Sequence, residues 1–239
     1  SNAAIQVINF GQIGFTMYQG HKWLKRLIAK EKPKILVLSY GINEQDYFRF
    51  FDTQGTNDVQ YFDGLYEKPF FSLPLMFLSK KISQWKFNTG LVCPPKILSN
   101  RIEHRQFIEQ LEKLKNDLKQ ETVRLVIVST VFNPHLVSRD YSLNSYLRLV
   151  QEMNASIDNH ECRSASQAFN RIRELDSARI KQKVNELNAL THQWAKRNGV
   201  DYLNLDDIIV KDDFVDSVHF NVTGNEKIAS ALFSLISPK

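Results

Sequence analysis

The chain has 239 residues, of which 43% are hydrophobic and 24% charged, so it can bury a substantial core and is not composed like a disordered protein. Its net charge is +5, but Lys and Arg are scattered along predicted helices, which argues against a nucleic-acid partner. No stretch is apolar over the length that a membrane-spanning helix needs. Cys93 and Cys162 lack the spacing of a metal site, and either one disulfide or two free thiols fits the sequence.

The first residues have two separate features. Ser1-Asn2-Ala3 resembles the scar of a cleaved expression tag, so the natural sequence is expected to begin near Ala4. Residues 4–10 read as a strand from the outset. No signal peptide is visible, and an extracytoplasmic protein whose N-terminal signal or anchor was removed is one expectation. The compartment itself stays open.

Strand and helix patterns then alternate along the chain. Continuous apolar runs or alternating patterns predict strands near residues 5–10, 35–40, 125–129 and 200–205. The helices between them carry apolar residues at spacings of three and four, as in Phe107, Leu111, Leu114 and Leu118. Pro33 ends the first helix, and Gly199 closes the helix that contains Ile180 to Trp194. This alternation predicts an α/β fold with a mostly parallel sheet between two helical layers.

Two stretches are too long for plain connections. Residues 45–103 and 133–175 are therefore interpreted as insertions, the first packing over one end of the sheet. No linker or repeat is visible, so residues 4–239 are expected to form a single domain. In parallel sheets of this kind, ligands bind at the carboxyl ends of the strands.

An aspartate and a histidine, Asp216 and His219, stand three residues apart just before the last helix. Thr223 and Glu226 fit a capping box for that helix, which places the acid and the histidine on its entry loop. There the carboxylate can hold one imidazole nitrogen while the other acts as a base. The alternative is a surface turn without function. The other histidines occur singly and are expected to be solvated: His21, His104, His135, His160 and His192.

Three blocks of the sequence together resemble the SGNH (GDSL-type) hydrolases. Residues 7–16 (VINFGQIGFT) look like the family's glycine block, and Gly41-Ile42-Asn43-Glu44 looks like its Gly-x-Asn-Asp block, with Glu44 where Asp is usual. Asp216-Ser217-Val218-His219 looks like its Asp-x-x-His block. The resemblance spans nearly the whole chain and implies a three-layer, flavodoxin-like sheet.

The resemblance also implies roles. Gly14, through its backbone N–H, and Asn43, through its side-chain amide, would form an oxyanion hole. His219 would be the base and Asp216 would orient it. The substrate would be a small-molecule or glycan ester, and the reaction would need no metal or organic cofactor.

The chain departs from the family at the nucleophile, because it contains no Gly-Asp-Ser block. That block lies on a strand that would be central in the sheet, so we expect a serine and a strand that this sequence does not contain. Among the serines present, Ser39 is expected to be buried in its strand, whereas Ser129 ends a strand and is a weak candidate. Gly55-Thr56-Asn57-Asp58 matches Gly-x-Asn-Asp, but it follows no strand and is interpreted as a turn.

The sequence therefore predicts an SGNH-type ester hydrolase or acyl transferase. The alternative is a catalytically inactive SGNH-like module that keeps the cleft to bind a glycan or acyl ligand. The acyl group, the alcohol and the oligomeric state do not follow from the sequence.

Overall fold

The computed structural model describes residues 6–12, 15–45, 81–82, 85–86, 89–94, 101–119, 121–133, 143–175 and 177–237. Its sheet has the strand order β1-β2-β3, formed by Ile35–Leu38, Arg124–Val128 and Asp201–Leu203. Both strand pairs are parallel, with Leu36 opposite Leu125 and Ile127 opposite Tyr202. Three of the four predicted strands therefore form one parallel sheet, as the apolar runs predict.

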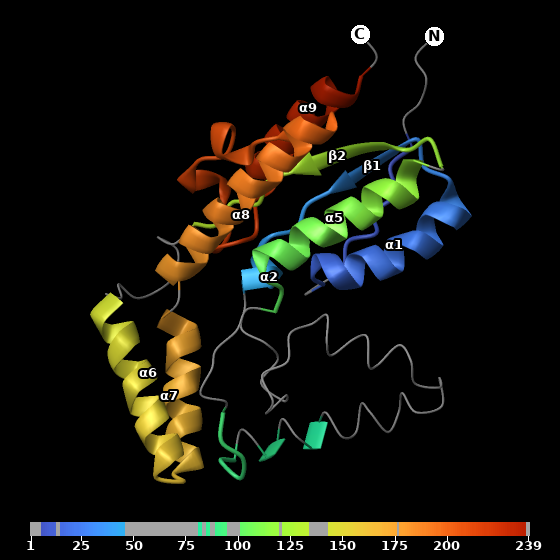
Figure 1. The fold of residues 1–239 in the computed structure, drawn as a ribbon. Helices are drawn as coiled ribbons and strands as arrows, with labels where there is room; N and C mark the ends of the chain where they lie inside the picture. Colours follow the sequence, from blue (N-terminus) through green and yellow to red (C-terminus); the bar gives the residue numbers. More distant parts are fainter. Residues whose placement is uncertain are drawn as a thin grey trace.

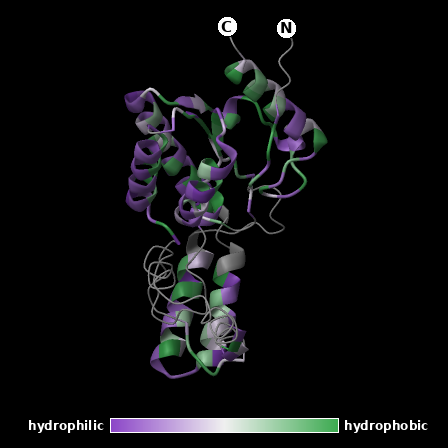
Figure 2. Cartoon of the chain, turned by 90° about the vertical axis from the view of Figure 1, so that its right-hand side faces the viewer, coloured by the Kyte–Doolittle hydropathy of each residue, from purple (hydrophilic) through white to green (hydrophobic). Residues whose placement is uncertain are grey.

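Helices cover the sheet on two sides (Figures 1 and 2). The helices are α1 (Met17–Glu31), α2 (Ile42–Gln45), α5 (His104–Lys119), α6 (Leu143–Asp158), α7 (Cys162–Leu175), α8 (Ser177–Asn198) and α9 (Val222–Ile236). Two 3₁₀ turns, η3 (Leu205–Asp207) and η4 (Lys211–Asp213), follow β3.

The sheet has a separate core on each face, because successive side chains of a strand point to opposite sides. Leu36, Leu125 and Ile127 pack with buried residues of α1, α5 and α8. On the other face, Val128 packs with Leu205 and with residues of α9. The fold is therefore the expected three-layer α/β/α arrangement.

The predicted first strand is wrong over its described part: residues 6–10 form no strand. Val7 is 84% exposed and Ile8 47% exposed. An apolar pattern makes a strand only when a neighbouring strand completes its hydrogen-bond ladder, and none pairs with these residues in the described part of the chain. Strand β1 likewise pairs only with β2 there, and its central Val37 is 40% exposed.

The second predicted insertion contains the pair α6 and α7, which lie side by side away from the sheet (Figure 1). Leu149 and Met153 of α6 pack against Phe169 and Ile172 of α7 in a core of their own. Figure 2 shows green, hydrophobic segments on both helices of this pair. The insertion is thus a helical hairpin with its own small core.

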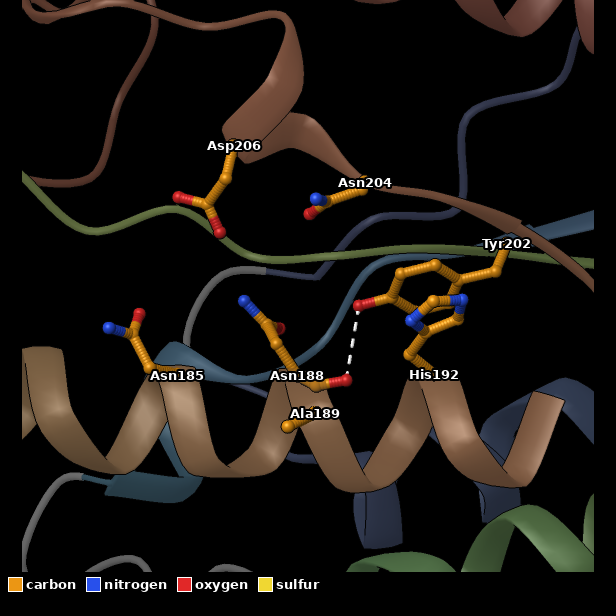
Figure 3. Close-up of a pocket in the computed structure, with 7 residues that line it drawn as sticks. All are labelled: Asn185, Asn188, Ala189, His192, Tyr202, Asn204 and Asp206. Carbon is orange, nitrogen blue, oxygen red and sulfur yellow. Dashed lines mark hydrogen bonds between the residues drawn. The ribbon is translucent and has the colours of Figure 1, made fainter. Parts of the chain in front are cut away.

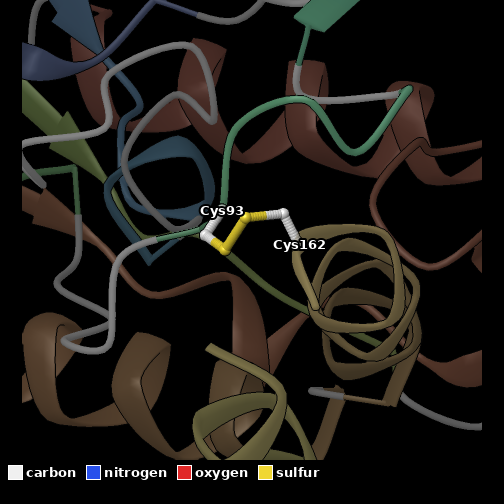
Figure 4. Close-up of a disulfide and its surroundings, with 2 residues drawn as sticks. All are labelled: Cys93 and Cys162. Atoms are coloured by element: carbon white, nitrogen blue, oxygen red, sulfur yellow. A yellow bond between two sulfur atoms is a disulfide. The ribbon is translucent and has the colours of Figure 1, made fainter. Parts of the chain in front are cut away.

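Cys93 and Cys162 form a disulfide, which decides between the two possibilities that the sequence leaves open (Figure 4). The bond joins residues 89–94 to the first residue of α7. Gly90 has a φ of +73°, and a Cβ there would lie 2.5 Å from Arg163 Cα, so the chain passes the start of α7 at a point where only glycine fits. No described helix is long and apolar enough to cross a bilayer.

Candidate functional site

The loop between η4 and α9 carries Asp216 and His219. Phe214 and Phe220 form an antiparallel bridge at its base, with ring centroids 5.0 Å apart. Inside this bridge the Val215 N–H donates to the His219 carbonyl at 2.8 Å. The loop is therefore a short closed turn that holds its side chains in place.

Helix α9 begins differently from the predicted capping box. Its N-cap is Asn221, whose Oδ1 accepts a hydrogen bond from Gly224 N–H at 3.0 Å, whereas Thr223 lies inside the first turn. Asparagine caps at least as well as threonine, so the earlier polar residue takes the position. A Cβ on Gly224 would lie 2.5 Å from the Asp213 carbonyl oxygen, so this turn packs tightly on η4.

An ion pair fixes η4 to α9. Both carboxylate oxygens of the buried Asp213 accept from Lys227 Nζ, at 2.7 and 2.8 Å. Asp213 Oδ2 also accepts from Val210 N–H at 2.8 Å. These hydrogen bonds lower the pKa of Asp213, the Lys227 bond most. The Asp216/His219 loop is thus anchored at both ends.

Asp216 and His219 are in direct contact: His219 Nδ1 lies 2.8 Å from Asp216 Oδ2. Asp216 Oδ1 accepts from the backbone N–H groups of Val218 and His219, each at 2.8 Å. The Val218 N–H and then the His219 side chain lower the pKa of Asp216 to about 2. A carboxylate only accepts, so Nδ1 carries a proton, and in the neutral imidazole Nε2 then keeps its lone pair. The imidazole is 76% exposed.

Of the two expected oxyanion donors, only Asn43 lies within the described residues. Gly14 lies outside the described residues. Asn43 is the second residue of α2 and is half-buried, and its Nδ2 donates to the Phe15 carbonyl at 2.9 Å. Asn57, the alternative to Asn43, also lies outside the described residues. Asn43 is thus joined to the chain that directly follows Gly14.

The Asn43 segment and the Asp216/His219 loop lie at the same edge of the sheet. Thr130 Oγ1, just past the end of β2, donates to the carbonyl of Tyr40 at 2.9 Å. Asn133 N–H donates to the carbonyl of Ser217 at 2.9 Å. Three residues span at most about 11 Å, so the loops after β1 and β3 both contact one short stretch at the carboxyl edge.

Ser129 does not have the surroundings of a nucleophile. Ser129 is 2% exposed, and its Oγ accepts from Leu205 N–H at 2.7 Å and donates to Asn204 Oδ1 at 3.3 Å. It joins β2 to the end of β3. Ser39 is exposed, not buried as expected.

Of the other histidines, His21 corrects the expectation of a solvated side chain. It is 4% exposed, with Nδ1 3.0 Å from Gln110 Oε1 and Nε2 2.8 Å from Asp117 Oδ2. Its role is to join α1 to α5. Among the described residues, no group of three His, Cys, Asp or Glu side chains could hold a metal.

A polar pocket of about 270 Å³ lies between α8 and the end of β3 (Figure 3). Its lining consists of Asn185, Asn188, Ala189, His192, Tyr202, Asn204 and Asp206. Asn188 exchanges hydrogen bonds with the backbone of Thr130, and Tyr202 OH donates to the Asn188 carbonyl at 3.2 Å. His192 stacks on Tyr202. These contacts fasten α8 to the sheet, which accounts for the polar lining.

The sequence analysis assigned no role to Glu44, which lies next to Asn43 in α2. Its side chain is fully buried, and Oε1 accepts from Met17 N–H at 2.6 Å. The only signal in the sequence is its place directly after Asn43. The contact partner lies 27 residues away, and no local pattern connects the two.

No protein-family model and no curated protein matches the chain. Among solved structures it is similar to a GDSL-like lipase from Bacteroides thetaiotaomicron, with a TM-score of 0.50 and 11% identity over 93% of this chain and 71% of that one. It is also similar to an acetyl-xylooligosaccharide esterase from Geobacillus, with a TM-score of 0.47 and 11% identity over 95% and 69% of the two chains. With the parallel sheet between its helical layers, the chain has the fold of the SGNH (GDSL-type) hydrolases.

Proposed function

We propose that the protein is a serine-type ester hydrolase or acyl transferase in which His219 is the general base and Asp216 orients it. The contact of 2.8 Å between His219 Nδ1 and Asp216 Oδ2 carries the proposal. No hydrogen bond to Nε2 occurs among the described residues, so this nitrogen is available to a serine hydroxyl. Such an arrangement, with the base oriented by a carboxylate, is what nucleophilic acyl transfer requires.

Asn43 and the Gly14 amide are proposed as the oxyanion donors. One N–H of the Asn43 amide is used by the Phe15 carbonyl, which leaves the second to donate to a tetrahedral intermediate. Losing one such donor typically costs about 100- to 1,000-fold in rate. The shared carboxyl edge of β1, β2 and β3 supports a common site for Asn43 and His219.

We further propose that the nucleophilic serine lies on a strand that this sequence does not contain. The support is the edge of β1, which pairs with β2 alone in the described chain and leaves Val37 40% exposed. Residues 6–10 have a strand-like sequence without a partner there. One added parallel strand between β1 and residues 6–10 would pair with both of them. Its carboxyl end would then lie at the proposed site.

Covalent labelling locates the nucleophile. A fluorophosphonate probe is applied to this chain and to the chain extended upstream as its gene encodes, and mass spectrometry identifies the labelled residue. We expect one labelled serine in a Gly-Asp-Ser segment of the extended chain, and loss of the label in its His219→Ala variant. Labelling of Ser129 or Ser39 would contradict the assignment, and absence of label from both chains would favour a binding module.

A further inference from the structure

Glu44 is the most deeply buried acid of the candidate site. Its side chain is 0% exposed, although a carboxylate is costly to bury without partners. Oε1 accepts from Met17 N–H at 2.6 Å, while Oε2 has no hydrogen-bond partner among the described residues. Met17 is the first residue of α1 and follows the N-cap residue Thr16. The carboxylate therefore fastens the start of α1 to α2.

Helix α2 is itself held from several sides. Ile102 N–H donates to the Glu44 carbonyl at 3.4 Å, and Arg179 Nη2 donates to the Gln45 carbonyl at 2.9 Å. Arg101, which is 5% exposed, donates to Gln19 Oε1 at 3.1 Å on α1. Residues just before α5 and at the start of α8 thus fix this four-residue helix. Helix α2 is therefore a rigid support for the neighbouring segment Phe15–Met17.

Two adjacent residues of α2 bind the two ends of the Phe15–Met17 segment. Asn43 Nδ2 donates to the Phe15 carbonyl at 2.9 Å, and Glu44 Oε1 accepts from Met17 N–H at 2.6 Å. The carbonyl and the amide belong to residues two apart. A single hydrogen bond would let this segment rotate about it, whereas two hydrogen bonds to the same short helix fix the segment's orientation relative to Asn43.

We propose that Glu44 is a positioning residue, which holds the Phe15–Met17 segment against Asn43 so that the Asn43 amide, a proposed oxyanion donor, keeps its orientation. This inference rests on the proposed function, because the orientation affects a rate only if the site receives an oxyanion. Glu44 itself touches neither substrate nor reacting atoms in this role.

The surroundings of Glu44 give the role a pH signature. Burial raises the pKa of Glu44 to about 7, opposed by the Met17 N–H and by the charge of Arg101. Tyr40 also faces the carboxyl group, and burial together with the Glu44 charge raises the pKa of Tyr40 to about 12. A proton on Oε2 leaves Oε1 free to accept, so the Met17 bond persists at low pH but loses its charge-assisted strength.

The Met17 amide tests the contact without any assay of activity. In ¹⁵N-labelled protein we expect the Met17 amide proton to move downfield in one step as pH rises through about 7, because the acceptor becomes charged. Glu44→Gln should keep the amide protected but remove the step. Glu44→Met, which has no strong acceptor, should speed Met17 exchange at least about tenfold. Gln110→Met, an equal change at a buried site on α5, should retain the wild-type step. A Met17 amide unchanged in Glu44→Met would overturn the contact.

Kinetics test the positioning role in whichever form of the protein hydrolyses p-nitrophenyl acetate. Glu44→Met should lower kcat about tenfold or more with KM nearly unchanged, and Glu44→Gln should recover to within about threefold of wild type. Gln110→Met should match wild type. Equal rates in Glu44→Met and Gln110→Met would overturn the role. If no form hydrolyses the ester, the proposed function fails, and so does positioning for catalysis, while the Met17 amide still decides the contact.

Discussion

Asn43 Nδ2 donates a hydrogen bond to the backbone carbonyl of Phe15 at 2.9 Å, across 28 residues of sequence. The bond connects the two blocks that resemble the oxyanion-forming segments of SGNH hydrolases. Asn43 is therefore both a structural residue, which holds the chain at Phe15, and the proposed donor to an oxyanion.

Replacing Asn43 should therefore reduce catalysis strongly. We expect Asn43→Ala to lower kcat for a small ester by about 100- to 1,000-fold, since one oxyanion donor is lost and the Phe15 carbonyl is released. Asn43→Asp, which exchanges the donor for an acceptor, should be as slow. Asn185→Ala on α8 is the matched control and should match wild type. A rate for Asn43→Ala within about threefold of wild type would exclude Asn43 from the oxyanion hole.

Glu44 should make stability depend on pH. Burial raises the pKa of Glu44 from its ordinary value of 4.5 to about 7 in the folded protein, so folding favours the protonated form. The stabilisation is full below about pH 4.5 and is lost as pH rises through about 7, a difference of about 3 kcal/mol. Urea unfolding from pH 4 to 8 measures it. The free energy of unfolding of wild type minus that of Glu44→Gln should fall over this range, and a flat difference would contradict the burial of a titrating Glu44.

Replacing Ser129 should change the stability of the protein but not its rate of hydrolysis. Ser129→Ala should keep wild-type hydrolysis but lower the free energy of unfolding by about 1–3 kcal/mol, because the Leu205 N–H loses its acceptor. Thr191→Val, which removes another buried hydroxyl, is the control for stability. Loss of activity in Ser129→Ala as complete as in His219→Ala would instead make Ser129 the nucleophile.

The disulfide should stabilise the protein. Cys93 and Cys162 are 69 residues apart, and closing a loop of that length is worth up to about 4 kcal/mol in the chain-entropy account. Urea unfolding of the double variant Cys93→Ser, Cys162→Ser should show a loss of this order or smaller, and reduction of the wild type should give the same loss. Two thiols that react with iodoacetamide in the untreated folded protein would show that the bond does not form.

Much of the fold follows from the sequence because its signals are local. The apolar runs that form β1 and β2, and Gly199 after α8 with its φ of +62°, are such signals. Asp216 and His219 are three residues apart, so their contact within one turn is also a local matter.

The sequence predictions are wrong where the structure of a residue depends on a partner far away in the sequence or on a competing residue nearby. Residues 6–10 have a strand pattern, but a ladder needs a second chain segment. His21 is buried between Gln110 and Asp117, which lie 89 and 96 residues away in sequence and contact its two ring nitrogens. Asn221 and Thr223 are both good N-caps, and the packing of Gly224 on Asp213 favours the earlier one.

The central claim is that His219 is the base of an ester-hydrolysing site, and one comparison tests it most directly. The rate of p-nitrophenyl acetate hydrolysis is measured for the gene-encoded, upstream-extended chain and for its His219→Ala variant. We predict that the variant loses at least about 1,000-fold in kcat, because a triad without its base keeps only the contributions of binding and the oxyanion hole. Hydrolysis that persists unchanged in His219→Ala would contradict the claim.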